Sequence, residues 1–124
     1  MRAMVVREHG GMEKLKLEPD FPDPRPGEGD VVLRVRASSL NYHDIFTRRG
    51  MPGIKLQLPL IMGLDVAGDI LEVGPGVAGW RVGDRVLVDP ISRVEGGLVG
   101  ETTTGGSPNA VASARTSLFV FPMP

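Results

Sequence analysis

The chain has 124 residues, and its 14 basic and 15 acidic side chains give a formal net charge of −1. This balance argues against a nucleic-acid or anionic-membrane surface, since both require clustered positive charge. The absence of cysteine excludes disulfides and a thiolate nucleophile, and no apolar run approaches the roughly 20 residues of a membrane helix. We therefore expect one domain over residues 1–124, located in the cytoplasm and binding neither nucleic acid nor membrane.

The first quarter of the chain predicts short strands and a long loop. Strand-like runs cover Ala3–Arg7 and Lys14–Glu18, with a turn at His9–Gly11 between them. In the second run leucines alternate with charged residues, which predicts one buried and one solvent-facing side. Pro19–Gly29 contains four prolines and is expected to be an irregular loop. A β-branched run over Val31–Ala37 then predicts the next strand.

The sequence period changes after this strand, and a short helix is expected. Ser39 or Asn41 can cap its amino end, because both side chains accept hydrogen bonds from helix-start amides. The helix is predicted to run through Arg49, and Gly50 suits a left-handed residue at its carboxyl end.

The remainder predicts further short strands joined by turns. We expect strands within Ile61–Val73, a turn at Gly74–Gly76, a turn leading into a buried strand over Val82–Val88, and a last strand over Leu118–Phe121. Gly68 would let another backbone approach closely. Between Pro90 and the last strand the signal is weak. The elements together predict a mainly β fold, a partly open barrel with one or two short helices.

Several motifs occur in a family-specific order: Leu40-Asn41-Tyr42-His43-Asp44, Arg49-Gly50, Pro59-x-x-x-Gly63-x-Asp65-x-x-Gly68, Val73-Gly74-x-Gly76-Val77 and Gly83-Asp84-Arg85-Val86. With them the chain resembles the GroES-like amino-terminal domain of the medium-chain dehydrogenase/reductase family, most clearly from Gly29 to Pro90. The resemblance implies an oxidoreductase that uses NAD(P)H. Zinc-dependent members carry Gly-His-Glu at the positions of Gly63, Leu64 and Asp65, and they place a cysteine where this chain has Asn41. Here Leu64 and Asp65 follow Gly63, so no zinc is expected.

The segment Gly74–Gly79 matches the dinucleotide-binding pattern G-x-G-x-x-G, which functions only when a helix follows it. Here Trp80–Asp84 leads into another turn, and a structural turn is the preferred interpretation. No other segment supplies a strand, glycine-rich loop and helix. The Rossmann domain that binds NAD(P)H in the family is therefore expected to be missing, and we predict no cofactor-binding residues in this chain.

The candidate catalytic residues are Asn41, His43 and Asp44. By the resemblance, Asn41 faces substrate and nicotinamide in zinc-independent quinone oxidoreductases, and an amide can hydrogen-bond a substrate carbonyl; alternatively it caps the helix. His43 stands where alcohol dehydrogenases place a proton-relaying Thr or Ser, but it also fits a surface histidine. Asp44 could orient a neighbour or bond helix-start amides. Phe46 replaces a tyrosine that these enzymes usually carry.

Four further expectations concern residues outside this set. Asp65 could bond backbone amides or line the cleft, and Arg48 with Arg49 is expected to be solvent-exposed. Pro108 weakens a strand, because it lacks an N–H for the sheet ladder. The family pattern is lost around residues 107–110 and then returns, which motivates the hypothesis of a local frameshift there.

Two classes of function remain open. The first is the substrate-side domain of a zinc-independent alcohol dehydrogenase or quinone oxidoreductase-like protein, inactive as an isolated chain and acting on an unknown small molecule. The second is a truncated, non-enzymatic remnant or a stand-alone GroES-like module that acts through association. The uncharged, β-prone strand over Leu118–Phe121 favours a homo-oligomer formed through exposed edge strands.

Overall fold

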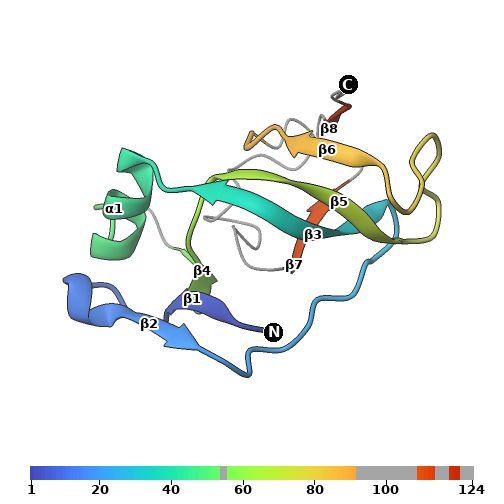
Figure 1. Cartoon of the computed structure of the whole chain (residues 1–124). Coiled ribbons are helices and arrows are strands. Elements are labelled where there is room, and N and C mark those ends of the chain that lie inside the picture. Colours follow the sequence, from blue (N-terminus) through green and yellow to red (C-terminus); the bar gives the residue numbers. More distant parts are fainter. Residues whose placement is uncertain (54–55, 92–108, 114–117, 121–124) are drawn as a thin grey trace.

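The computed structural model describes residues 1–53 and 56–91 with their side chains, and the backbone of two further strands at 109–113 and 118–120. Two antiparallel sheets make up most of it (Figure 1). One sheet has the order β2-β1-β4, and the other has the order β7-β3-β5-β6-β8. Their strands are β1 (Ala3–Val6), β2 (Leu15–Glu18), β3 (Asp30–Ser39), β4 (Leu60–Ile61), β5 (Asp65–Val73), β6 (Arg85–Val88), β7 (Asn109–Ser113) and β8 (Leu118–Val120).

Two short helices complete the described part: η1 (Met12–Lys14), a single 3-10 turn, and α1 (Tyr42–Arg49). In Figure 1 α1 lies at the end of the long strand β3, on the side where β1 and β2 also approach. Within the described segments the two sheets are separate and do not close into one cylinder. The predicted mainly β, partly open GroES-like architecture is therefore confirmed. No helix in these segments is long and apolar enough to cross a lipid bilayer.

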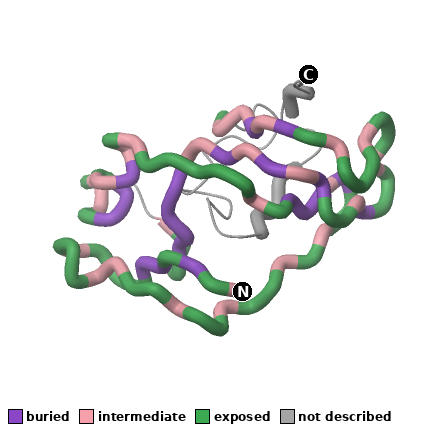
Figure 2. Tube along the Cα trace, viewed as in Figure 1, coloured by how far each residue is buried: buried purple, intermediate pink, exposed green. Residues whose placement is uncertain are grey.

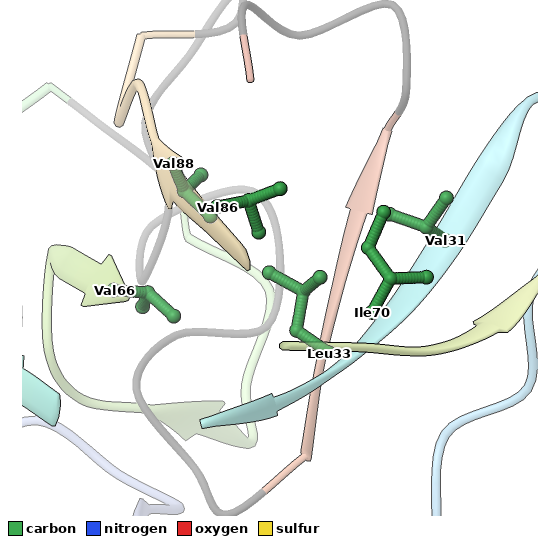
Figure 3. Close-up of a cluster of buried hydrophobic side chains, with 6 residues drawn as sticks. All are labelled: Val31, Leu33, Val66, Ile70, Val86 and Val88. Atoms are coloured by element: carbon green, nitrogen blue, oxygen red, sulfur yellow. The ribbon is translucent and has the colours of Figure 1, made fainter. Parts of the chain in front are cut away.

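The main core lies against one face of the five-stranded sheet (Figure 3). Its members alternate along β3, β5 and β6, because successive side chains of a strand point to opposite faces. They are Val31, Leu33, Val66, Ile70, Val86 and Val88, each at most 4% exposed. A second, smaller cluster joins Ala3 and Val5 of β1 to Ile61 of β4. Figure 2 shows the buried stretches of the tube concentrated in these strands and in α1.

The structure confirms the use of two glycines. A Cβ on Gly68 would collide with the backbone carbonyl oxygen of Arg34 on the neighbouring strand, so only glycine allows β3 and β5 to approach this closely. Gly50 ends α1 with a φ of 89°, a conformation that favours glycine over other residues.

The Gly74–Gly79 segment is a turn, as predicted. Gly74 donates its N–H to the carbonyl of Asp30 at 2.8 Å, and Gly29 donates to the carbonyl of Pro75 at 2.8 Å. The chain then continues through a second turn into β6, and no helix follows the glycines. These contacts tie the turn to the first residue of β3 and to the residue before it, which is a structural role.

Two expectations about strands are wrong. Leu17 is 63% exposed, so β2 has no buried leucine face. An alternating pattern identifies residues that share one side of a strand, but it does not tell whether another element covers that side. Here β2 is an edge strand. The sequence also missed β7, which pairs with β3 immediately after Pro108. Proline is tolerated where a strand begins. The last strand is described over Leu118–Val120, and residue 121 lies outside the described residues.

Candidate functional site

Two side chains that were predicted as site residues, Asn41 and Asp44, stabilise the amino end of α1. Asn41 is the N-cap residue, with extended backbone angles of −112° and 169°. The Asp44 carboxylate accepts the backbone N–H of Asn41 at 2.7 Å, while the Asn41 side chain faces the backbone N–H of Asp44, which is the arrangement of a capping box. The prediction that Asn41 caps the helix is confirmed.

Asp44 also connects the helix to the segment before β5. Its second carboxylate oxygen accepts the N–H of Gly63 at 2.9 Å, and the side chain is only 5% exposed. Both oxygens therefore bond backbone amides, which favours the interpretation of Asp44 as a residue that holds helix-start amides. Sequence reasoning did not identify Gly63 as its partner.

Asp65 joins Asn41 and Ser39 in a small polar cluster. A single carboxylate oxygen of Asp65 accepts the Ser39 hydroxyl at 2.6 Å and the Asn41 side-chain amide at 2.9 Å. The antiparallel pairing of β3 with β5 places Ser39 directly opposite Asp65. These two hydrogen bonds, that of Ser39 first, lower the pKa of the Asp65 carboxyl below its ordinary value. Asp65 therefore bonds side chains and not backbone amides, which were one of the two roles that the sequence left open for it.

The other residues of α1 differ in exposure. His43 is half-buried, whereas Tyr42 and Phe46 are 75% and 48% exposed. The two rings lie one helical turn apart, with centroids 5.6 Å from each other and planes inclined by 59°. Phe46 thus forms part of an exposed aromatic pair and brings no hydroxyl to the neighbourhood of Asn41.

An apolar groove of about 400 Å³ runs beside α1. This volume falls within the range of small-molecule sites. Its lining combines β2, η1 and α1 with Met62: Met12, Leu15, Leu40, Asn41, Tyr42, Asp44, Ile45, Arg48 and Met62. The carboxylate of Asp44 and the guanidinium of Arg48 are both already bonded to backbone groups, so the groove presents mainly apolar side chains. The periodicity of the sequence did not reveal it, because its walls come from separate segments.

The carboxyl end of α1 is held by the turn after β1. Gly10 donates its N–H to the carbonyl of Arg48 at 3.0 Å, and the Arg48 guanidinium donates to the carbonyl of Gly10. His9 donates from Nδ1 to the carbonyl of Thr47 at 3.0 Å. These bonds satisfy carbonyls that a helix end otherwise leaves without partners. Arg48 is consequently 5% exposed, and the expectation that it faces solvent is wrong, whereas Arg49 is exposed as expected.

The residues present do not suit a zinc ion. The three positions that the motifs align with the zinc ligand region are occupied by Asn41, Leu64 and Asp65, and the only carboxylate among them bonds Ser39 and Asn41. Zinc in proteins is bound by cysteine, histidine and carboxylate donors. Among the described residues no group of three or more such side chains is close enough to bind one ion.

Comparison with known proteins agrees with this fold. Residues 27–118 match the alcohol dehydrogenase GroES-like domain. The chain belongs to this family. A quinone oxidoreductase of Lama guanicoe is 44% identical over 97 residues, which cover 78% of this chain and 29% of that protein. An acryloyl-coenzyme A reductase of Metallosphaera sedula is 39% identical over 87 residues, 70% of this chain and 25% of that protein.

Solved structures give the same result. The crystal structure of AibC superposes with a TM-score of 0.87 at 35% identity, covering 100% of this chain and 39% of that chain. A mycobacterial protein solved with NADPH superposes with a TM-score of 0.77 at 29% identity, covering 98% of this chain and 34% of that one. The chain spans only 25–29% of the length of the quinone oxidoreductase and the acryloyl-coenzyme A reductase named above.

Proposed function

We propose that this chain is the substrate-side domain of a zinc-independent, NAD(P)H-dependent oxidoreductase that reduces a carbonyl compound or an enone. The observation that carries the proposal is the side-chain amide of Asn41, which lies at the start of α1 with Asp65 as its partner at 2.9 Å. An amide nitrogen has two hydrogens. Asp65 takes one of them, and the described residues leave the other for a substrate oxygen.

The surroundings of Asn41 support this role. The apolar groove that it lines suits an uncharged, partly apolar molecule, because the charged groups of the lining are already paired within the protein. Quinones and enones combine an apolar body with a carbonyl oxygen. The similarity to a quinone oxidoreductase and to an acryloyl-coenzyme A reductase favours the same class of substrate.

Zinc has no part in the proposed reaction. A leucine side chain offers no donor atom, and a neutral amide is a poor substitute for the thiolate that zinc prefers. Metal analysis of the purified and dialysed chain tests this directly. Stoichiometric zinc would contradict it.

The described residues are also unsuited to hold NAD(P)H. The one glycine-rich segment, Gly74–Gly79, leads into β6 rather than into a helix whose amino end could face a pyrophosphate. We therefore propose that the described residues do not bind the cofactor, and we expect the isolated chain to be inactive. Micromolar NADPH should not quench the fluorescence of Trp80 in a saturable way.

A two-domain chimera tests the proposed function. The complete chain is joined to the cofactor domain of the 44% identical quinone oxidoreductase, and NADPH oxidation is followed with quinones, enones and aldehydes. Loss of one donor to a substrate oxygen typically lowers kcat about 10²-fold or more, so Asn41→Ala should reduce turnover by about that factor. Gln57→Ala, which removes an exposed amide outside the groove, is the matched control.

The same assay provides the contradicting outcomes. If the Asn41→Ala and Gln57→Ala chimeras turn over equally well, Asn41 does not contact the substrate. If the unmodified chimera binds NADPH but reduces none of the three substrate classes, the proposed reaction is wrong.

A non-enzymatic association module is the second candidate function. Large apolar side chains are exposed around α1, among them Met12 at 68%, Leu40 at 67% and Tyr42 at 75%. In addition, β7 and β8 form the two edges of the five-stranded sheet, and an edge strand presents backbone groups to which another chain can pair. Light scattering of the purified chain distinguishes the two candidates when it is read together with the chimera assay.

A further inference from the structure

We infer that Asp65 is a positioning residue, which with Ser39 holds the Asn41 amide so that one of its hydrogens points away from the protein scaffold. The basis is a single carboxylate oxygen that accepts hydrogen bonds from the Ser39 hydroxyl at 2.6 Å and from Asn41 Nδ2 at 2.9 Å. The inference rests on the proposed function in that it names the purpose of the positioned amide. The positioning itself is measurable without turnover.

The charge of Asp65 determines which end of the amide faces it. An ionised carboxylate accepts hydrogen bonds and donates none, so the amide nitrogen, and not the amide oxygen, must lie toward Asp65. The reversed amide would bring two oxygens together. Asn41 therefore has one stable orientation, in contrast to an exposed asparagine, whose amide can turn over at little cost.

The capping-box arrangement also brings the same side chain against the amino end of α1. The Asn41 side chain faces the backbone N–H of Asp44, while its nitrogen is bonded to Asp65. With the nitrogen of the amide held by Asp65, the planarity of the amide limits the direction of its second hydrogen. A donor held in this way needs no reorganisation when a substrate oxygen arrives, which is the condition for effective electrostatic stabilisation.

The sheet supplies the rigidity of Asp65. Ser39 and Asp65 are directly paired residues at the ends of β3 and β5, and Val66, the next residue of β5, is 1% exposed in the main core. The carboxylate therefore stands at one end of the long pairing between β3 and β5. Ser39 and Asn41 donate to the same carboxylate oxygen of Asp65, and the bond from Ser39 limits rotation of that carboxylate.

The experiment is an NMR measurement on the complete, ¹⁵N-labelled chain. The Nδ2 hydrogen that bonds Asp65 should resonate downfield of its partner and exchange more slowly with solvent. Asp65→Ala should move this resonance upfield and remove the protection, and Asp65→Asn, which retains an acceptor oxygen, should keep part of both. Asp69→Ala is the matched control, because Asp69 lies on the same strand and accepts from Arg36 instead.

The outcomes separate this inference from the proposed function. If Asp65→Ala retains the fold but leaves both Asn41 side-chain resonances unchanged, Asp65 does not position the amide. If these resonances move as expected but Asn41→Ala leaves the chimera fully active, the positioning is correct and the proposed function is wrong.

A wild-type measurement covers the case in which Asp65→Ala fails to fold. During acid titration the Asn41 side-chain amide should follow the carboxyl carbon of Asp65. The neighbouring titratable side chains, Asp44, which accepts the backbone N–H of Asn41, and His43, are followed in the same titration through their own resonances. A side-chain amide that follows Asp44 or His43, or that does not move, overturns the inference.

Discussion

Replacing Asp44 with alanine should destabilise the protein strongly, because this carboxylate is the shared acceptor for two separate segments. It accepts the N–H of Asn41 at 2.7 Å and the N–H of Gly63 at 2.9 Å. A buried donor that loses its acceptor costs about 1–3 kcal/mol. The Gly63 bond is buried and the Asn41 bond is partly buried, so the two losses sum to about 4 kcal/mol. Relief of carboxylate burial offsets part of this and leaves a net loss of about 3 kcal/mol.

That loss is large compared with the 5–15 kcal/mol that holds a typical domain together. For a chain of this size it corresponds to a decrease in Tm of about 10 °C. Urea and thermal unfolding can be followed by the fluorescence of Trp80, which packs against the main core. Asp20→Ala, at an exposed turn position, is the control. If Asp44→Ala unfolds within 0.5 kcal/mol of the wild type, the inferred fastening of α1 is wrong and a direct role in chemistry becomes the better interpretation.

Three further predictions follow from other contacts. Gly68→Ala should destabilise by about 1–3 kcal/mol, since its methyl group meets the Arg34 carbonyl, and an unchanged urea midpoint would contradict this. Because the pKa of Asp65 is lowered by folding, its contribution to stability is complete above about pH 5 and is lost as the pH falls through the lowered value. Asp65→Asn should therefore differ from the wild type in urea midpoint at pH 7, and the difference should shrink as the pH falls through the lowered pKa of Asp65. Phe119→Lys with Phe121→Lys should shift an oligomer toward monomer in light scattering, and a wild type that is wholly monomeric at tens of micromolar would refute association through this strand.

Much of the fold was predictable because short-range signals determine it. Glycine at position 68 indicated a close backbone approach, and Asn41 with Gly50 marked the two ends of α1. The proline-rich loop and the Gly74–Gly79 turn follow from residues that restrict the backbone or give it unusual freedom. These features need no knowledge of distant partners.

The contacts of the candidate site were less predictable because they depend on strand register. Asn41 and Asp65 are 24 positions apart and meet only because β3 pairs with β5. That pairing contains two irregularities, between Val32 and Leu33 and between Val35 and Ala37, each of which changes which residues lie opposite one another. A sequence pattern with a strict period of two cannot reveal such shifts. The partner of Asp65 therefore had to come from the structure.

Burial of charge was the other feature that the sequence concealed. Arg48 and Arg49 are adjacent and chemically identical, but the first is 5% exposed and the second is exposed. The difference arises because Arg48 faces the turn after β1 and bonds the carbonyl of Gly10, 38 positions away in the sequence. A charged residue can be buried only where such a partner exists, and the partner here belongs to a segment with no helical or strand signal of its own.

The two carboxylates near Asn41 have different tasks, and this difference decides how variants should be interpreted. Asp44 bonds backbone amides and is buried, so its loss should appear as lost stability. Asp65 bonds side chains, so its loss should appear first in the orientation of the Asn41 amide. Reduced turnover in an Asp44 variant would therefore reflect a loosened helix. Reduced turnover in a folded Asp65 variant would reflect a misdirected donor, provided that the Asn41 side-chain resonances move with it.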